Sequence, residues 1–197
     1  MSEMRIDLLR HGEVEGGRVY RGSRDDALTN EGWGAMHAAV GDTREWTRII
    51  SSPLQRCRAF AEELAAQLGV PLAIDARWRE IHFGDWEGKS ADELMQSCPE
   101  AITRFWEDPE RHTPPNGETL AAFCARVEEV WDDVVAQPAS ERLLIVTHGG
   151  PIRFILGRAC GLPVAETLRL DIPLAYRCRM TIEPVRARHD SLQGEIA

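Results

Sequence analysis

An apolar strand that ends in an arginine–histidine pair is the feature that most constrains this chain. Residues 6–9 form a short, continuously apolar run, and Arg10, His11 and Gly12 follow it at once. Such a run is typical of a strand in a parallel sheet that is covered on both faces. Open α/β sheets bind their ligands beyond the carboxyl ends of these strands. The sequence therefore predicts an anion-binding arginine and a candidate nucleophile at one edge of a sheet.

A second histidine follows an apolar run in the same way. Residues 143–146 form the clearest buried strand, and Thr147, His148 and two glycines come directly after it. If the two strands run parallel, both imidazoles emerge at the same edge of the sheet. Glycine lets a ligand approach the backbone, and the helix start that follows offers N–H groups and a positive dipole end to an anion. We therefore expect His11, His148 and Gly149 to lie around one anionic ligand.

Two arginines suit a phosphate group. Guanidinium makes planar, bidentate, charge-assisted hydrogen bonds and stays ionised, so Arg10 and Arg56 are the expected anion ligands. Among the three arginines in the polar loop after the first histidine, Arg21 is the favoured third contact because Gly22 follows it. Other arginines are interpreted as surface charges, namely Arg58, Arg126 and Arg142.

A carboxylate completes the chemistry that these groups indicate. Phosphoryl transfer needs positioning, charge neutralisation and a proton for the leaving oxygen. A neutral imidazole nitrogen attacks phosphorus when its other ring nitrogen donates to a fixed acceptor. Glu80 is the expected proton donor and later the base that activates water, whereas surface or loop-bracing roles are favoured for Glu13 and Glu87. No H-E-x-x-H pair, Asp-rich loop or Walker loop is present, so neither a metal nor another cofactor is expected.

Strand-like and helix-like patterns alternate along the chain. We expect strands at 6–9, 48–51, 72–74, 143–146, 168–172 and 176–183, and helices at 30–40, 53–68, 90–106, 117–135 and 149–161. This alternation predicts a three-layer α/β fold, with a mostly parallel sheet and helices on both faces. We expect a single domain over residues 1–197, with a cap-like excursion around 80–116 above the carboxyl edge of the sheet.

Two local interpretations bear on the site. Ser52 is predicted to cap the second helix, with Pro53 in its first position and Gln55 completing a capping box. Aromatic side chains in the excursion are open to two roles, as core residues or as pocket walls that contact a ring of the ligand, and the core role is favoured. They are Trp86, Phe105 and Trp106.

Composition limits the partners and the compartment. The net charge of −9 argues against nucleic acid, because duplex binding depends on a basic face, but it does not exclude a small phosphorylated metabolite. No apolar stretch approaches the roughly 20 residues of a membrane span, and no signal peptide is recognised. Five scattered cysteines without a C-x-x-C pair fit reduced thiols, so a cytoplasmic protein is expected. Cys57 is interpreted as a core residue, and the oligomeric state is not predicted.

Four ordered segments carry a family resemblance. They are Arg10-His11-Gly12, Ser51-Ser52-Pro53-Leu54-Gln55-Arg56, residues 79–88 and Thr147-His148-Gly149-Gly150. Together they resemble the histidine phosphatase superfamily, with its phosphoglycerate-mutase-like fold, over about residues 5–184. The resemblance implies that His11 becomes phosphorylated, that Arg10, Arg56 and His148 form the phosphate pocket, and that Glu80 is the proton donor.

Within that superfamily the chain is most similar to the α-ribazole phosphatase family. The similar stretches are Tyr20-Arg21-Gly22 and residues 26–29, 82–88 and 116–118. This resemblance implies a phosphomonoesterase that acts on α-ribazole 5′-phosphate in cobalamin biosynthesis. One departure is Gly17, where many relatives carry an asparagine in the phosphate pocket; either the loop is shortened or Arg21 compensates.

Three alternatives remain at the level of sequence. A phosphoglycerate mutase is disfavoured because mutases of this family are usually longer and shield the phosphoenzyme from water. A broad-specificity sugar phosphatase remains open. A non-enzymatic phosphate-binding relative is disfavoured because the set formed by Arg10, His11, Arg56, Glu80 and His148 is intact.

Overall fold

The computed structural model describes residues 3–138 and 140–182. In this part of the chain five strands form one sheet in the order β3-β2-β4-β1-β5. They are β1 (Met4–Arg10), β2 (Arg48–Ser51), β3 (Leu72–Ile74), β4 (Arg142–Thr147) and β5 (Arg177–Ile182). Strands β1 to β4 run parallel to one another, and β5 runs antiparallel to β1. The predicted mostly parallel sheet is confirmed.

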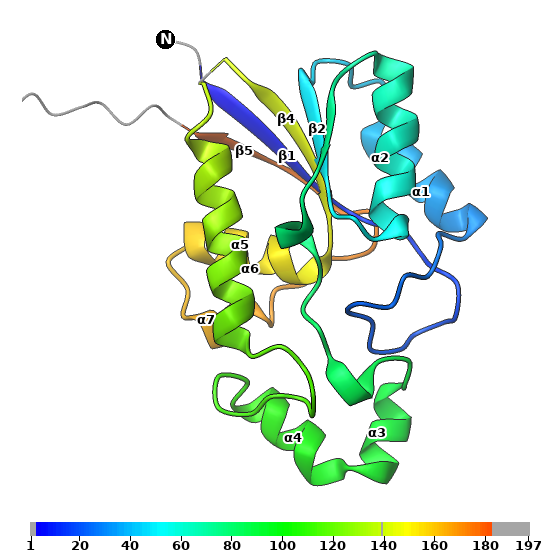
Figure 1. Ribbon diagram of the computed structural model, residues 1–197, viewed down its shortest axis with the longest axis vertical. Helices are drawn as coiled ribbons and strands as arrows, with labels where there is room; N and C mark the ends of the chain where they lie inside the picture. The colour runs from blue at the N-terminus through cyan, green and yellow to red at the C-terminus, as the bar shows by residue number, and fades with distance from the viewer. Residues whose placement is uncertain (1–2, 139, 183–197) are drawn as a thin grey trace, which may run out of the picture.

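Helices cover both faces of this sheet (Figure 1). One face packs against α1 (Asn30–Val40) and α2 (Gln55–Leu68), and the other packs against α5 (Leu120–Val135) and α6 (Gly149–Ala159). The remaining described helices are α3 (Ala91–Ser97), α4 (Pro99–Glu107), α7 (Val164–Thr167) and two short 3-10 turns at Ala76–Trp78 and Gly84–Trp86. The three-layer α/β prediction is confirmed.

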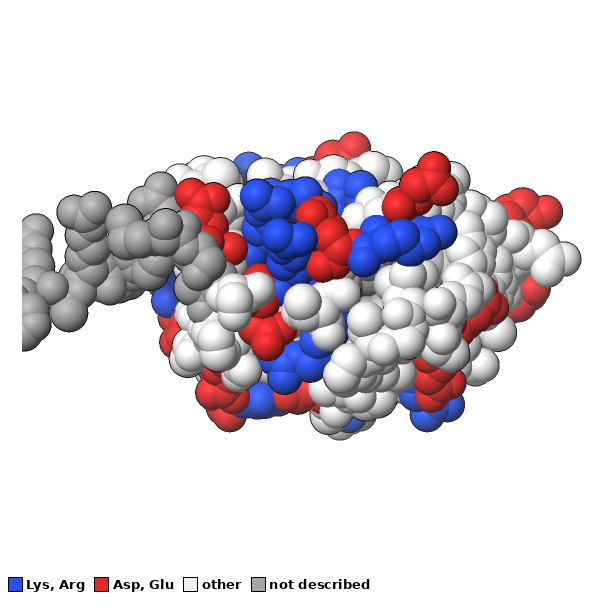
Figure 2. Space-filling model, turned by 90° about the horizontal axis from the view of Figure 1, so that it is seen from above, with Lys and Arg blue, Asp and Glu red and all other residues white. Residues whose placement is uncertain are grey.

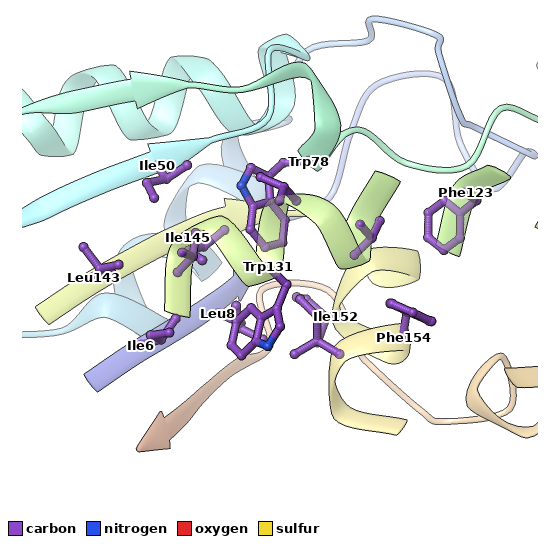
Figure 3. Close-up of a cluster of buried hydrophobic side chains, with 14 of the residues drawn as sticks. Ile6, Leu8, Ile50, Trp78, Phe123, Trp131, Leu143, Ile145, Ile152 and Phe154 are labelled. Atoms are coloured by element: carbon purple, nitrogen blue, oxygen red, sulfur yellow. The ribbon is translucent and has the colours of Figure 1, made fainter. Parts of the chain in front are cut away.

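Alternation along the strands divides the core into two layers. Leu8 and Ile145 point toward α5 and α6, where they pack with Trp131 and Ile152 (Figure 3). Their chain neighbours point to the opposite face, because successive strand side chains alternate. Since both faces are covered, the central strands read as continuous apolar runs, which is why they were visible in the sequence.

The predicted start of the second helix is wrong. Leu54 has extended backbone angles, so α2 begins at Gln55, and Ser52 makes no capping bond to its first turn. The Gln55 N–H donates instead to the carboxylate of Asp25, which lies in the loop after β1. A distant loop thus supplies the cap that Ser52 was expected to supply, and Ser52 is left for another contact.

The predicted helix over 90–106 is two helices. Ser90 begins the first with the expected capping box, but the chain breaks at Cys98 because Pro99 follows it. A residue that precedes proline is sterically excluded from the α conformation, and Pro99 then starts α4 at its favoured first position. Similarly, the helix expected over 117–135 starts at Leu120, where the Thr119 hydroxyl accepts from the Ala122 N–H.

The strand expected at 168–172 is absent. Residues 168–170 continue as turns after α7, and the Leu170 N–H donates to the Thr167 carbonyl. This turn carries the chain across the carboxyl edge of the sheet, so that β5 returns antiparallel to β1. The strand expected at 176–183 is confirmed as β5, and position 183 lies outside the described residues.

The excursion forms a small layer of its own beyond the carboxyl ends of the strands (Figure 1). Its buried cluster consists of Trp86, Leu94, Ile102 and Phe105, which confirms the core role of two of the expected aromatics. Trp106 is 48% exposed, so the core interpretation is wrong for this residue. The organisation as a single domain over residues 1–197, with a cap-like excursion around 80–116, stays a prediction.

The opposite end of the molecule is charged. Viewed from above, arginines and carboxylates lie side by side there (Figure 2). Arg179 pairs with the buried Asp7 at 2.8 Å and with Glu45 at 2.5 Å, which ties the middle of β5 to the middle of β1. Within the described residues, no helix combines the length and the apolar character needed to cross a bilayer.

Candidate active site

The two strand-end histidines meet at the carboxyl edge of the sheet. Arg10 pairs with Thr147 in the parallel ladder of β1 and β4, so His11 and His148 leave their strands at the same level. Their ring centroids lie 5.2 Å apart in an edge-on arrangement. The predicted juxtaposition of the two imidazoles is confirmed.

His11 is held in a state suited to nucleophilic attack. Its Nδ1 lies 2.8 Å from the carbonyl oxygen of Gly12, which can only accept, so Nδ1 carries the proton and Nε2 keeps a lone pair. Burial, and then the charges of Arg56 and Arg10, lower the pKa of His11 well below its ordinary value. The ring is therefore neutral at pH 7. Its backbone is fixed by bonds from the His11 N–H to Thr147 and from the Ala175 N–H to His11.

Arg56 lies beneath the two histidines with no exposed surface. Its Nε donates to Nδ1 of His148 at 3.2 Å, and its Nη atoms donate to the carbonyls of Gly22 and Arg24. Burial lowers the pKa of this guanidinium from its usual value. Even so, guanidinium stays charged near neutral pH. It is thus a fixed, fully buried positive charge beside His148.

Arg10 and Gly149 form one side of the site. Arg10 donates to the carbonyl of Ile172 through Nη1, while its buried Nε has no hydrogen-bond partner among the described residues. A Cβ at Gly149 would lie 2.8 Å from Arg153 Nη1 and 3.4 Å from Arg10 Nε. Glycine is therefore needed here so that two guanidinium groups can approach the start of α6. The unpaired Nε is a donor that an anion would satisfy.

Glu80 reaches the same place from the segment that follows the 3-10 turn at Ala76–Trp78. Its Oε2 accepts from the Gly150 N–H at 3.1 Å, and its Oε1 accepts from the Ile81 N–H at 3.0 Å. A Cβ at Gly150 would come within 2.1 Å of Glu80 Oε1, so this second glycine admits the carboxylate. The structure therefore brings the predicted proton donor to the edge where the histidines lie.

Arg126 is not the surface charge that the sequence suggested. Its guanidinium donates to the carbonyls of Arg77, Arg79 and Glu80 at 2.8 to 2.9 Å. It also makes a bidentate pair with Glu118 at 2.7 and 2.8 Å. Arg126 thus holds the segment that carries Glu80. The sequence did not reveal this role of Arg126, because the three carbonyls lie more than 45 residues away from it along the chain.

The rival carboxylates brace loops, as predicted. Glu87 accepts from the N–H groups of Ser23 and Arg24 at 2.8 and 2.9 Å, which joins the loop after β1 to the excursion. Glu13 accepts from the Thr29 hydroxyl at 3.2 Å.

Arg21 and the two surface arginines can also be placed. Arg21 lines the cavity, but its donors bond to Asp26 and to the carbonyls of Gly17 and Glu15, so its contact with a ligand stays a prediction. The side chains of Arg58 and Arg142 are each 47% exposed, which confirms them as surface charges.

Ser52 is a site residue that the sequence misassigned. Its buried hydroxyl lies 2.7 Å from Nε2 of His148. Cys57 packs against the same imidazole, with Sγ 3.7 to 3.8 Å from its nitrogens, and burial raises the pKa of this thiol to about 12. The predicted core role of Cys57 is therefore confirmed, and its thiol is protonated.

A cavity of about 940 Å³ opens above Arg10, His11 and Glu80. Its walls also contain residues that the sequence analysis did not assign to the site, because they come from separate segments of the chain. They are Val19, Tyr20, Phe83, Ala91, Arg153, Asp171 and Leu174. Within the described residues, no group of three or more His, Cys, Asp or Glu side chains is arranged to hold a metal ion.

Comparison with known proteins identifies the family. A model of the histidine phosphatase superfamily (branch 1) matches residues 6–193. The chain belongs to the histidine phosphatase superfamily. The solved structure of the alpha-ribazole phosphatase from Shigella flexneri superimposes with a TM-score of 0.80 at 26% identity and covers 89% of each chain. The predicted family and phosphoglycerate-mutase-like fold are thus confirmed.

Relatives of this chain within the superfamily differ in the activities that their names state. The adenosylcobalamin/alpha-ribazole phosphatase of Salmonella typhimurium is 31% identical over 168 residues, or 83% of each protein. A glucosyl-3-phosphoglycerate phosphatase of Mycolicibacterium vanbaalenii is 33% identical over 83% of this chain and 77% of that protein. A bifunctional protein of Mycobacterium tuberculosis is 32% identical over 87% of this chain, which spans about half (48%) of that relative's length.

Proposed function

We propose that this protein is a phosphomonoester hydrolase that works through a phosphohistidine at His11. The observation that carries the proposal is the state of that imidazole. It is neutral, its Nδ1 is bonded to the Gly12 carbonyl, and its Nε2 keeps a lone pair beside Arg10 and Arg56. Two arginines offset the charge of a phosphoryl group, and a neutral nucleophile avoids the cost of desolvating an anion.

The two half-reactions follow from these positions. In the first, Nε2 of His11 bonds to phosphorus while the phosphorus–oxygen bond of the ester breaks, and the protonated Glu80 gives its proton to the departing oxygen. In the second, water attacks the phosphohistidine, Glu80 takes the water proton, and the phosphorus–nitrogen bond breaks to release inorganic phosphate. His148 orients Arg56 beneath the phosphoryl group throughout.

For the substrate we propose α-ribazole 5′-phosphate, which places the protein in cobalamin biosynthesis. The supports are the residue-level resemblance and the name of the Salmonella relative. A broad-specificity sugar phosphatase or phosphoglycerate mutase is the alternative, since the glucosyl-3-phosphoglycerate phosphatase is similar to the same extent. A cytoplasmic location, a small phosphorylated metabolite as the partner, no binding of nucleic acid or membrane, and the lack of a cofactor stay predictions from the sequence.

The test combines a substrate panel with trapping of the intermediate. Phosphate release is measured for α-ribazole 5′-phosphate, 3-phosphoglycerate and glucosyl-3-phosphoglycerate, and a rapid acid quench with labelled substrate is followed by peptide mapping. We expect acid-labile label on His11, no turnover in His11→Ala, and full turnover in the matched variant of an exposed histidine, His112→Ala. Full activity of His11→Ala would refute the mechanism, and a preference for either phosphoglycerate compound would refute the substrate.

A further inference from the structure

The cavity above His11 is much larger than a phosphoryl group requires. Its volume of about 940 Å³ lies at the upper end of the range for sites that enclose whole small molecules. Part of its lining is charged, whereas Val19, Tyr20, Phe83 and Leu174 contribute apolar and aromatic surface. The cavity is therefore shaped for an alcohol that carries a sizeable apolar group.

Tyr20 is fixed in this wall. Its hydroxyl accepts from Nε1 of the exposed Trp106 at 2.7 Å, and its ring meets those of Phe83 and Trp86 edge-on at centroid distances of 5.1 and 5.7 Å. Its backbone is bonded on both sides, from its own N–H to Lys89 and from Gly88 to its carbonyl. A ring held this firmly loses little conformational entropy when a ligand binds against it.

The Tyr20 hydroxyl is already hydrogen-bonded within the protein. The Trp106 N–H bonds to one lone pair of that oxygen and holds the side chain, and the ring of this cavity-lining residue supplies an aromatic surface. Phe83, its edge-on neighbour in the same wall, adds a second aromatic ring without polar atoms. Such walls favour planar groups, which gain dispersion and quadrupole contacts on aromatic faces.

The remaining side of the cavity is polar. Arg153 donates to the carbonyl of Leu170 through Nε, and it lines the cavity together with Arg10, Glu80 and Asp171. Hydroxyl groups between the phosphate and the planar group would find donors and acceptors there. The lining of the cavity thus combines charged and polar side chains around Arg10 with aromatic side chains.

We propose that Tyr20 and Phe83 are specificity-determining residues that bind a planar ring carried by the alcohol of the substrate. This inference rests on the proposed phosphatase function, but it concerns only recognition of the leaving alcohol. Tyr20 and Phe83 take no part in the chemical steps.

The experiment uses substrates that differ only by the ring. The kcat/KM of α-ribazole 5′-phosphate and of AMP is divided by that of ribose 5-phosphate, for the wild type and for Tyr20→Ala, Tyr20→Leu, Tyr20→Phe and Phe83→Ala. The ratio cancels general losses of folding or active fraction. Stacking of a base on an aromatic side chain is worth about 10- to 100-fold, so the wild-type ratio is expected in that range for at least one ring compound.

The variants separate a ring subsite from a structural role. Tyr20→Ala and Phe83→Ala should each lower the ratio at least about fivefold, Tyr20→Leu should lower it because planarity is lost, and Tyr20→Phe should keep most of it. Met95→Ala is the control, since Met95 is a 50% exposed side chain on α3 that does not line the cavity. If Tyr20→Ala fails to fold, Phe83→Ala and Tyr20→Leu give the same comparison.

Failure of the inference is distinguishable from failure of the proposed function. Turnover of all three compounds with a wild-type ratio near one, or a ratio that the Tyr20 and Phe83 variants leave unchanged, overturns the aromatic subsite while the phosphatase stands. If no compound is hydrolysed, the phosphatase proposal fails, and calorimetric Kd values for AMP and ribose 5-phosphate replace kcat/KM. Equal affinity for these two compounds then overturns the subsite as well.

Discussion

Nε of Arg56 lies 3.2 Å from Nδ1 of His148, and neither side chain has any exposed surface. Because a guanidinium can only donate, Nδ1 of His148 must accept and its proton must sit on Nε2. That Nε2–H points at the Ser52 hydroxyl 2.7 Å away. One arginine therefore selects the tautomer of His148, and the hydroxyl of one buried serine accepts the hydrogen bond from its Nε2–H.

The first prediction concerns Ser52 as a positioning residue. Ser52→Ala leaves the Nε2–H of His148 without a partner, which typically costs about 1–3 kcal/mol, and allows the ring and Arg56 to shift. We expect kcat/KM to fall roughly tenfold, with weaker competitive inhibition by inorganic phosphate. The control is Ser51→Ala, since that equally buried hydroxyl donates only to a backbone carbonyl. Equal losses in the two variants would contradict a specific role for Ser52.

The second prediction concerns Glu80 as the proton donor. In Glu80→Gln a poor leaving group must depart as an alkoxide, so phosphorylation by an alkyl phosphate should slow by about 10²–10⁴-fold. An activated aryl phosphate needs no such proton and should lose much less in that step. Single-turnover rates for the two esters, wild type against variant, decide the point. If both esters lose equally, the acid role passes to Glu13 or Glu87.

The third prediction concerns Arg126, which holds the segment before Glu80. Arg126→Met keeps the apolar stem but frees three carbonyls and leaves Glu118 without its partner. We expect kcat for alkyl phosphates to fall about tenfold or more, because a misplaced acid weakens the proton transfer. An aryl phosphate should be affected less, as for the Glu80 variant. A uniform loss on both esters would indicate general destabilisation instead of mispositioning.

The fourth prediction concerns the dependence of stability on pH. Burial lowers the pKa of His11 and His148 well below their ordinary value of 6.5 in the folded state. As the pH falls through about 6.5, these histidines take up protons in the unfolded chain but stay neutral in the folded chain. Their contribution to the free energy of unfolding is therefore complete above that pH and decreases below it. Each histidine contributes a slope of at most about 1.4 kcal/mol per pH unit.

Urea denaturation between pH 7.5 and 5 measures this slope. For His148→Gln, the free energy of unfolding should change with pH less steeply than for the wild type, by the equivalent of about one proton. This holds whatever the absolute stability of the variant. The exposed His112 supplies the control, because His112→Gln should keep the wild-type slope. An unchanged slope in His148→Gln would show that this imidazole does not stay neutral in the folded protein.

The fifth prediction concerns metal ions. Arg10 lines the cavity, and the charges of both Arg10 and Arg56 act on His11. We expect these two charges to offset that of a phosphoryl group, so turnover should not depend on a divalent cation. Activity after exhaustive treatment with EDTA should equal that of the untreated protein. Loss of activity that magnesium or zinc restores would show that a metal supplies part of that charge.

The sequence alone determined the two central strands and the histidines at their ends. Residues 6–9 and 143–146 are apolar because both faces of their sheet are covered, and this local pattern does not depend on which segments cover them. Parallel pairing then leaves a single edge at which His11 and His148 can emerge. The break before Pro99 is equally local, since it follows from the sterics of one residue, although the predicted helix over 90–106 did not include it.

Tertiary structure alone decided which distant groups satisfy each polar atom. Ser52 has the sequence of a helix cap, yet its hydroxyl meets His148, 96 residues away, while Asp25 takes the N–H at the helix start. Arg126 has the sequence of a surface charge, yet it holds the segment before Glu80. Local propensity leaves such choices open because several partners are close to equal in energy, and only the packed arrangement of the layers determines which partner is within reach.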